Sequence, residues 1–265
     1  MVDGGYSFEG IDLKDERDIR NLEPRDLRGI DYVIHLAAQA KVQLSIDRPL
    51  FTNSHNTMGT LNLLWCAKEA KVKRFIYSSS SSVYGNQKTL PLKEDMKPNP
   101  MSPYATQKLI GEYYCKQFSQ LYGLPTVSLR YFNVYGEDMP TDSQYSACIA
   151  RFLDFKKNNK PLTVYGGNQT RDFTYVGDII NAILSALHSP RVGNGEIINV
   201  GGGRNYSIND VANAISDKCE YLPQKKGEPQ HTLASISKAK RLLEWKPEIN
   251  LIKWLKNSKK SLEEG

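Results

Sequence analysis

The sequence predicts an α/β fold built around a parallel sheet. Short apolar runs typical of buried strands alternate with longer helical segments, and this alternation is typical of strands joined by crossover helices. The 265 residues are 40% hydrophobic, which is enough to bury the core of one large domain or two small ones. No internal repeat interrupts the alternation, and the only low-complexity segment is a run of serines.

The expected elements follow this alternation along the chain. A long helix should begin at Ser102-Pro103 and end at Gly123, because serine is a preferred N-cap, proline suits the first helical position and glycine often follows the last turn. The other expected strands are 32–37, 75–77, 126–129 and 196–200, and the other expected helices are 57–70 and 179–187. We expect 137–172 and the tail after Gly203 to be more irregular.

Composition narrows the function classes. The net charge is +6, but the 35 basic residues are scattered, with no stripe and no interleaved aromatic platform. A solvated surface or a pocket for a pyrophosphate-bearing ligand fits this pattern better than nucleic acid does. The four cysteines lie far apart without metal-ligand spacing, so we expect small buried thiols in a reducing compartment and no metal site. No run approaches about 18 apolar residues, so we expect a soluble cytoplasmic protein with no membrane partner.

Three segments carry the candidate chemistry. They are the serine run 78–82 with Val83-Tyr84-Gly85 after it, the pair Tyr104 and Lys108, and the strand that begins Arg130-Tyr131-Phe132-Asn133. Together they place a hydroxyl, a phenol and an ammonium where a hydride and a proton could leave one carbinol.

A tyrosine can act as a base near neutral pH only if its pKa is lowered. Tyr104 and Lys108 are four residues apart on a helix and therefore share one face. The unperturbed pKa of a tyrosine is about 10, but a nearby ammonium and the positive end of the helix would lower it. The alternative interpretation is an amphipathic helix with a surface tyrosine and lysine.

In order and spacing, these segments resemble the extended short-chain dehydrogenase/reductase family, most closely its NAD-dependent nucleotide-sugar epimerases of the UDP-glucose 4-epimerase type. The resemblance runs from about Gly10 to Leu251. It implies a Rossmann-like doubly wound parallel sheet with a smaller α/β substrate-capping lobe. The expected boundaries are 1–136 plus 174–202 for a truncated dinucleotide-binding domain and 137–173 plus 203–265 for the substrate lobe. It also implies a UDP-sugar substrate and a homodimer built from the helices at Thr57 and Tyr104.

One expected part of such an enzyme is missing from the sequence. A Gly-x-x-Gly-x-x-Gly turn should hold the dinucleotide pyrophosphate at a helix N-terminus. Gly4-Gly5 lacks this spacing, and Gly201-Gly202-Gly203 lies too late in the chain. The first segment that resembles the family is Gly10-Ile11-Asp12-Leu13. When this segment is aligned with the family, about 50 residues and the first two strands of the sheet are absent before it. We therefore expect a truncated enzyme, either a fragment or a chain whose start codon was placed too far downstream, in which strand 32–37 forms an aggregation-prone edge.

The resemblance also assigns roles to single residues. Tyr104 would take the proton of the sugar 4-hydroxyl while a hydride passes from C4 to the nicotinamide, Lys108 would hold the nicotinamide ribose, and Ser80 would orient the hydroxyl. Asn56 could equally be a satisfied helix-cap amide, and His35 is expected to be a structural strand residue. The expected cofactor contacts are Asp12, Leu13, Leu36, Ala37, Ala38, Asn56, Tyr104, Lys108 and Phe132.

The substrate contacts are implied in the same way. A guanidinium at Arg171 would fit a diphosphate bidentately. Lys225 stands where relatives have arginine, and Ser235 stands where they have a carboxylate, so the sugar is left open. Ser81 and Ser82 replace the acid that dehydratases use, which favours simple epimerisation. The expected substrate contacts are Ser80, Asn133, Val164, Tyr165, Arg171 and Lys225.

Three functions remain open at this point. The first is C4 epimerisation of a UDP-sugar of the UDP-glucose/UDP-galactose type through a 4-keto intermediate. The second is a uronate epimerase or decarboxylase on the same scaffold, and the third is a non-catalytic protein that has lost its cofactor. NAD rather than NADP rests on the family alone. Without the glycine turn, we expect the 265-residue chain to bind NAD weakly and to be inactive.

Overall fold

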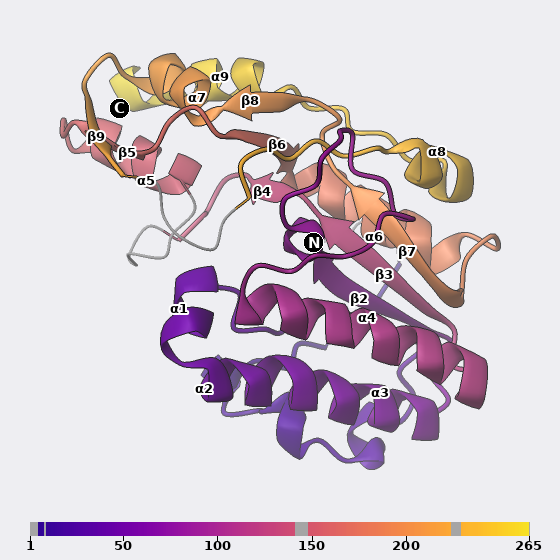
Figure 1. The fold of residues 1–265 in the computed structure, drawn as a ribbon. Coiled ribbons are helices and arrows are strands. Elements are labelled where there is room, and N and C mark those ends of the chain that lie inside the picture. The colour runs from indigo at the N-terminus through magenta and orange to yellow at the C-terminus, as the bar shows by residue number, and fades with distance from the viewer. Residues whose placement is uncertain (1–4, 8, 141–147, 224–228, 265) are drawn as a thin grey trace.

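The largest sheet has four parallel strands. The computed structural model describes residues 5–7, 9–140, 148–223 and 229–264. Within them the sheet order is β1-β2-β3-β7, and every neighbouring pair is parallel (Figure 1). The α/β fold with a parallel sheet is thus confirmed. The four strands are β1 Tyr32–His35, β2 Arg74–Ser80, β3 Thr126–Tyr131 and β7 Asn194–Val200.

Helices cover both faces of this sheet. Helices α3 (Gly59–Glu69) and α4 (Pro103–Tyr122) pack on one face, and α6 (Val176–His188) packs on the other (Figure 1). Each face has its own apolar cluster, because a parallel sheet with crossover helices buries both sides of its strands. The sheet is therefore doubly wound, as the sequence predicted.

The long helix α4 forms where its caps predicted. The Ser102 hydroxyl accepts the Ala105 N–H at 3.2 Å, Pro103 occupies the first turn, and Gly123 ends the helix at φ 68°. Gly111 allows α4 to lie close to β2, since an added Cβ would sit 2.2 Å from the Tyr77 hydroxyl oxygen. The packing of α4 on β2 thus depends on a missing side chain.

The helix expected over 57–70 is the last part of a longer helical segment. It begins with α1 (Val42–Asp47) and α2 (Pro49–Asn53), and a π-helical turn at Ser54–Met58 leads directly into α3. Pro49 starts α2 at its first position, which interrupts the helix after α1. Before β1 the chain forms three short 3-10 turns, η1 Leu13–Asp15, η2 Ile19–Asn21 and η3 Pro24–Leu27, and another, η5 Ser81–Tyr84, follows β2.

The segments expected to be irregular and to form the smaller lobe contain short strands. A three-stranded sheet has the order β4-β6-β8, and a separate pair joins β5 to β9. Only the expected irregularity was wrong, because these strands are short and pair with partners far away in the sequence. The lobe elements are β4 Asn133–Tyr135, α5 Cys148–Lys157, β5 Leu162–Tyr165, β6 Thr170–Tyr175, β8 Asn205–Ser207, α7 Ile208–Ile215, β9 Cys219–Leu222 and α9 Leu251–Glu264, while α8 Ser237–Leu243 packs near β7.

The division into two domains remains a prediction. Strand β4 belongs by its hydrogen bonds to the small sheet, although the expected boundary at 136 put it in the first domain. The boundary between 173 and 174 also falls inside β6. In the large sheet, β1 is an edge strand as expected, but it spans only four residues.

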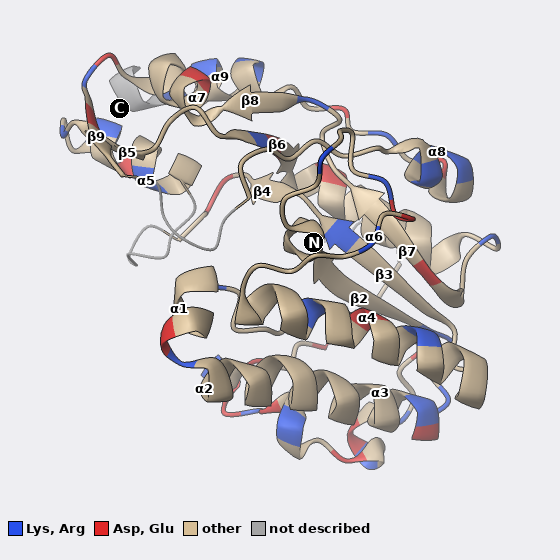
Figure 2. Cartoon of the chain, viewed as in Figure 1, with Lys and Arg blue, Asp and Glu red and all other residues tan. Residues whose placement is uncertain are grey.

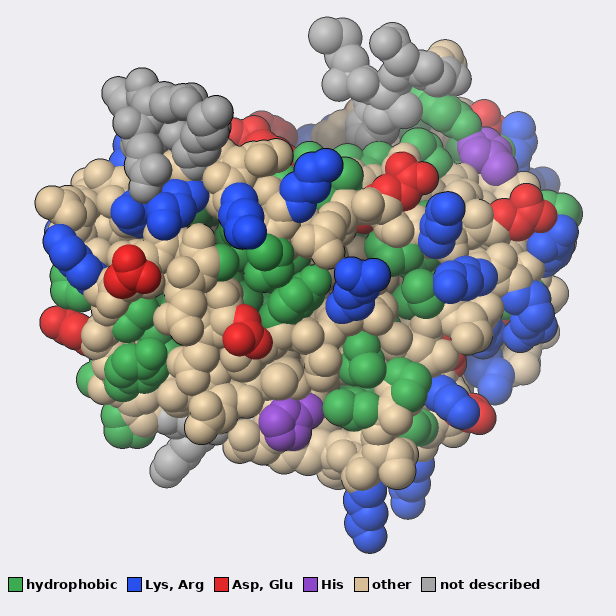
Figure 3. Space-filling view, turned by 90° about the horizontal axis from the view of Figure 1, so that it is seen from above, with side chains coloured by type: hydrophobic (Ala, Val, Ile, Leu, Met, Phe, Trp, Pro, Cys, Tyr) green, Lys and Arg blue, Asp and Glu red, His purple; other side chains and the backbone are tan. Residues whose placement is uncertain are grey.

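The surface charges are scattered as expected from the composition, but the cysteines are buried only in part. Lys and Arg lie scattered over the elements and over the face seen from above (Figures 2 and 3). Cys66 and Cys115 are buried as expected, but Cys148 and Cys219 are only partly buried. Within the described ranges, no group of His, Cys, Asp or Glu side chains could hold a metal ion. No helix in the same ranges is long and apolar enough to cross a membrane, and the cytoplasmic location stays a prediction.

Candidate active site

A buried ion pair sets the position of α4 on the sheet. Glu112 of α4 accepts two hydrogen bonds from Arg130 of β3, at 2.8 Å from Nε and 2.7 Å from Nη2. Both side chains are at most 2% exposed, and the Ser79 hydroxyl of β2 also donates to the Glu112 carboxylate. Tyr104, Lys108 and Glu112 are spaced by four residues and share one face of α4. The ion pair of Glu112 with Arg130 therefore holds this face against the ends of β2 and β3.

The three expected catalytic residues come together at the end of β2. Lys108 Nζ donates to the Ser78 carbonyl at 2.8 Å and lies 5.9 Å from the centre of the Tyr104 ring. The Ser80 hydroxyl lies close enough to the Tyr104 phenol to favour its ionised form. Ser80 also accepts hydrogen bonds from the N–H and the hydroxyl of Ser82, at 3.2 and 2.9 Å.

The pKa of Tyr104 differs from the expectation. Burial raises it above the ordinary value, and Ser80 opposes this only in part. The expected lowering by Lys108 and the helix end was therefore wrong for the protein alone. Burial also lowers the pKa of Lys108 to about 8. At neutral pH the phenol is protonated and the ammonium is still charged, so ionising Tyr104 requires further positive charge nearby.

The loop after β1 is attached to α4 close to Tyr104. The Asn56 side-chain oxygen accepts the Gln39 N–H at 2.7 Å, and its amide nitrogen donates to the Gln39 carbonyl and to Gln107. Ser45 of α1 accepts the backbone N–H of Tyr104 at 3.0 Å. Asn56 is 2% exposed, so we propose that it positions the loop rather than contacting the cofactor directly.

Five of the expected cofactor residues line one cavity of about 530 Å³. This cofactor cavity lies between segment 9–13 and the end of β1. Leu13 and Leu36 are 49% and 61% exposed, and an apolar wall of this kind suits an adenine ring. Asp12 caps η1 by accepting the Lys14 N–H at 2.9 Å. The five residues are Asp12, Leu13, Leu36, Ala37 and Ala38.

Phe132, another expected cofactor residue, does not line that cavity, whereas His35, expected to be structural, does. Phe132 is 1% exposed and packs in a core cluster with Tyr84, so its ring is covered by protein. His35 is buried as a strand residue, and its Nε2 lies 2.8 Å from the Thr60 hydroxyl. Because Thr60 donates its own hydrogen to Asn56, Nε2 of His35 is the protonated nitrogen.

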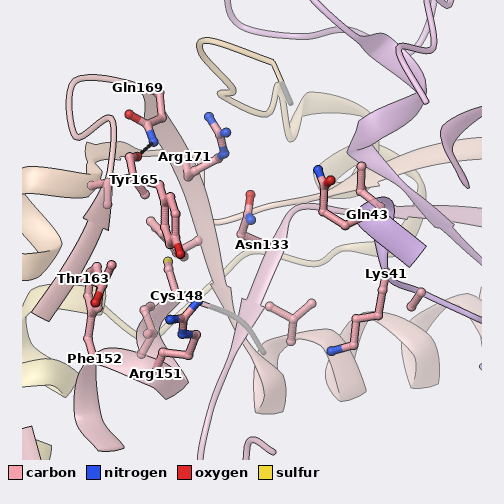
Figure 4. A pocket seen from close by; sticks show the side chains of 16 residues that line it. Lys41, Gln43, Asn133, Cys148, Arg151, Phe152, Thr163, Tyr165, Gln169 and Arg171 are labelled. Carbon is pink, nitrogen blue, oxygen red and sulfur yellow. Dashed lines mark hydrogen bonds between the residues drawn. The ribbon is translucent and has the colours of Figure 1, made fainter. Parts of the chain in front are cut away.

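A second cavity, of about 350 Å³, lies between the start of α1 and the small lobe. We call it the substrate cavity. Of the expected substrate residues, Asn133, Tyr165 and Arg171 line it (Figure 4). Val164 does not: it is fully buried in the core of the lobe, and its neighbours in β5, Thr163 and Tyr165, face the cavity instead. Lys225 lies outside the described residues.

Arg171 is held by two backbone carbonyls. Its Nη1 donates to the carbonyls of Thr170 and Gln230, at 3.1 and 3.3 Å. The next residue, Asp172, is fully buried and accepts the N–H groups of Gly202, Gly203 and Ala234, at 2.6, 3.0 and 2.9 Å. Burial raises the pKa of Asp172 to about 7, although the three donors favour its ionised form.

The glycine run after β7 has a structural reason. An added Cβ at Gly202 would lie 2.3 Å from the Phe173 carbonyl oxygen, and Gly203 has φ 67°. The run therefore lets the backbone cross close to β6, where Asp172 binds it. Sequence reasoning missed Asp172, Arg151 and Lys41; only Asp172 had a visible signal, because it directly follows Arg171 in the expected nucleotide-binding segment.

The lowered pKa of Lys108 predicts a pH dependence of stability. Between pH 8 and 10.5 the unfolded chain binds more protons at this site than the folded chain, so the penalty for burying Lys108 falls as pH rises. We expect the free energy of unfolding of the native chain, relative to Lys108→Met, to increase over that range in urea titrations. Lys88 is exposed and serves as the control: the free energy of unfolding of the native chain relative to Lys88→Met should show no such trend. Parallel curves for native and Lys108→Met would contradict the assignment.

The comparisons with known proteins agree with this geometry. The sequence profile of the NAD dependent epimerase/dehydratase family matches residues 2–201. The chain is 34% identical to a putative UDP-glucose 4-epimerase of Methanocaldococcus jannaschii, over 96% of this chain and 85% of that protein. It is 37% identical to a UDP-glucuronate 4-epimerase of Thermodesulfobacterium geofontis, over 96% of this chain and 78% of that protein.

A solved structure is similar over nearly the whole chain. The UDP-glucose 4-epimerase of Thermotoga maritima, determined with UDP-glucose, matches with a TM-score of 0.88 and 32% identity, over 94% of this chain and 84% of that one. The fold is therefore that of a Rossmann-like epimerase, and the enzyme class of these relatives is isomerase. This chain belongs to the NAD dependent epimerase/dehydratase family and, within it, to the UDP-sugar epimerases.

Proposed function

We propose that the site epimerises a UDP-hexose at C4, with the glucose/galactose pair as the first candidate. The observation that carries this proposal is the convergence of Ser80, Tyr104 and Lys108 at the end of β2. Arg171 in the substrate cavity supports it, because a guanidinium fits a diphosphate. The UDP-glucose bound in the Thermotoga maritima relative supports the same substrate class.

The chemistry follows from the positions of these side chains. Tyr104 accepts the proton of the sugar 4-hydroxyl, and Ser80 orients that hydroxyl. NAD, when bound, supplies the acceptor and then the donor of the C4 hydride. The 4-keto sugar turns in the cavity before it is reduced on its other face, and Tyr104 returns the proton to the new hydroxyl. Burial raises the pKa of the Tyr104 phenol, so its ionisation needs positive charge beyond Lys108, which oxidised NAD would supply when bound.

The two serines after Ser80 favour epimerisation over elimination. Ser81 is buried, and Ser82 donates its hydroxyl hydrogen to Ser80. Neither is an acid strong enough to protonate a leaving hydroxyl. We therefore propose that the 4-keto sugar is reduced again rather than dehydrated.

Cofactor binding should be the weak step. The cofactor cavity offers residues for the adenine, and Lys108 could hold the nicotinamide ribose. The sequence of 265 residues contains no Gly-x-x-Gly-x-x-Gly turn for the pyrophosphate, so the described residues offer it no such set of backbone N–H donors at a helix end. We propose that residues 1–265 retain little NAD and are inactive without added cofactor.

We expect slow turnover that depends on Tyr104. Residues 1–265, supplied with millimolar NAD and UDP-glucose, should form UDP-galactose far more slowly than the Thermotoga maritima relative, as measured by proton NMR. Tyr104→Phe should remove the turnover without weakening NAD or UDP binding, because only the proton acceptor is lost.

The controls for this experiment separate the open functions. Without added NAD we expect no product. Turnover as fast as that of the relative would contradict the cofactor proposal, and Tyr104→Phe with more than a few per cent of native activity would contradict the catalytic assignment. Binding of UDP without any NAD-dependent turnover would favour the non-catalytic alternative.

We also propose a homodimer formed through α3 and α4. These helices border an apolar groove of about 900 Å³, which contains Met58, Trp65 and Leu121, and Leu121 is 72% exposed. An exposed apolar groove between two helices suits a four-helix contact with a second copy.

Leu121→Glu should convert the dimer to a monomer in sedimentation velocity, because a charge would be buried in the contact. The matched control is Leu222→Glu, which lies on β9 of the small lobe and should leave the dimer intact. A native chain that sediments as a monomer at all concentrations would contradict the proposal.

A further inference from the structure

The ammonium of Lys108 is buried with few groups to balance its charge. Lys108 is 5% exposed, and its Nζ donates to the Ser78 carbonyl at 2.8 Å. Among the described residues no carboxylate forms an ion pair with it, because Glu112, one turn further along α4, is bound to Arg130. One hydrogen bond offsets only part of the cost of burying an ammonium, which has three hydrogens to donate. A second favourable contact is therefore needed at this position.

The face of the Tyr77 ring supplies that contact. Tyr77 is fully buried in β2 and directly precedes Ser78, so the ring and the carbonyl reach Lys108 from the same strand. The ammonium lies over this ring, 5.1 Å from its centre, and is 5.9 Å from the centre of the Tyr104 ring. A cation within about 6 Å of a ring centre is attracted by the negative charge of the ring face, most strongly where water is excluded.

Neighbouring groups fix the orientation of the Tyr77 ring. Its hydroxyl donates to the Lys108 carbonyl at 3.4 Å, and an added Cβ at Gly111 would come within 2.2 Å of the hydroxyl oxygen. The His35 ring of β1 lies 5.6 Å from the Tyr77 ring at an angle of 42°. Burial and the charge of Lys108 lower the pKa of His35 to about 3, so His35 is neutral and brings no second charge to the ring.

The other ionisable groups near Lys108 do not replace this contact. Burial lowers the pKa of Lys108 to about 8, and Cys115 and Glu112 on the same helix oppose this only in part. Burial also raises the pKa of the Cys115 thiol and of the Tyr104 phenol, so both are neutral near pH 7. Besides the Ser78 carbonyl, the Tyr77 ring is thus the contact of the described chain that stabilises the charge directly.

We propose that Tyr77 is a positioning residue whose ring face holds the charged ammonium of Lys108 beside Tyr104. Its importance for the reaction rests on the proposed function, in which Lys108 supports the Tyr104 phenolate and holds the nicotinamide ribose. Its effect on Lys108 itself belongs to the protein alone and can be measured without cofactor or substrate.

The test is an NMR titration of Lys108 in the full chain with carbon-13-labelled lysine, in which Lys108→Met identifies the signal. In Tyr77→Leu, which removes the ring, the pKa of Lys108 should fall by about one unit, because the ring no longer stabilises the ammonium. In Tyr77→Phe, which removes only the hydroxyl, the pKa should stay unchanged. A role confined to packing predicts the opposite sign for Tyr77→Leu, since water entering the vacated space would raise the pKa toward its ordinary value.

A fluorinated series keeps the test valid if Tyr77→Leu does not fold. Replacing Tyr77 by phenylalanine with one, two or three ring fluorines nearly preserves the size of the ring but weakens the negative charge of its face. The pKa of Lys108 should fall with each added fluorine, whereas a packing role predicts no such trend.

The matched control is Tyr131→Leu. Tyr131 lies on the neighbouring strand β3, and its hydroxyl accepts a hydrogen bond from Ser78 at 3.4 Å. The described rings over which Lys108 lies are those of Tyr77 and Tyr104, so removing the Tyr131 ring should not lower the pKa of Lys108.

The outcomes separate this inference from the proposed function. A Lys108 pKa that does not fall in Tyr77→Leu or along the fluorine series, or that falls equally in Tyr131→Leu, would overturn the inference and leave the proposed function intact. In the NAD-dependent turnover, Tyr77→Leu should move the loss of activity at alkaline pH about one unit lower, because Lys108 loses its charge at a lower pH. A native chain without any such turnover would overturn the proposed function, but not the contact between Tyr77 and Lys108.

Discussion

The buried ion pair between Glu112 and Arg130 is the contact on which the rest of the site depends. Two charges at most 2% exposed are tolerated because their hydrogen bonds are bidentate and the Ser79 hydroxyl adds a third. The pair fixes both the rotation and the axial position of α4, since Gly111 lets the helix lie directly on Tyr77. The positions of Lys108 and Tyr104 follow from it, because they lie one and two turns nearer the start of the helix.

The remaining parts of the site are held by buried polar groups that bind backbone. Asn56 and Ser45 attach the loop and helix after β1 to α4, and this loop supplies residues to the walls of both cavities. Asp172 attaches the small lobe to the glycine run after β7. The lobe carries Arg171 and Arg151, and the large sheet carries Tyr104 and Lys41. The substrate cavity therefore exists only where both sets of contacts are made.

The sequence predicted the features that depend on residues close together in the chain. The start and end of α4 could be read from Ser102 and Gly123, and the spacing of Tyr104 and Lys108 gave their shared face. It could not show which side of β5 faces the cavity, so Val164 was placed at the substrate although it lies in the core. It could not show burial, which raises the pKa of Tyr104 instead of lowering it. Lys41, Arg151 and Arg171 are far apart in sequence, so only the fold reveals their common cavity.

The most direct test of this account is a double-mutant cycle between Glu112 and Arg130, read by urea unfolding and by NMR of labelled tyrosine rings. Each single variant, Glu112→Gln or Arg130→Met, should lose about 3–5 kcal/mol, because it leaves one charge buried without its partner. The double variant should lose much less than the sum, and the Tyr104 signal should shift in both single variants. Small additive losses with an unchanged Tyr104 signal would show that the ion pair does not hold the catalytic face.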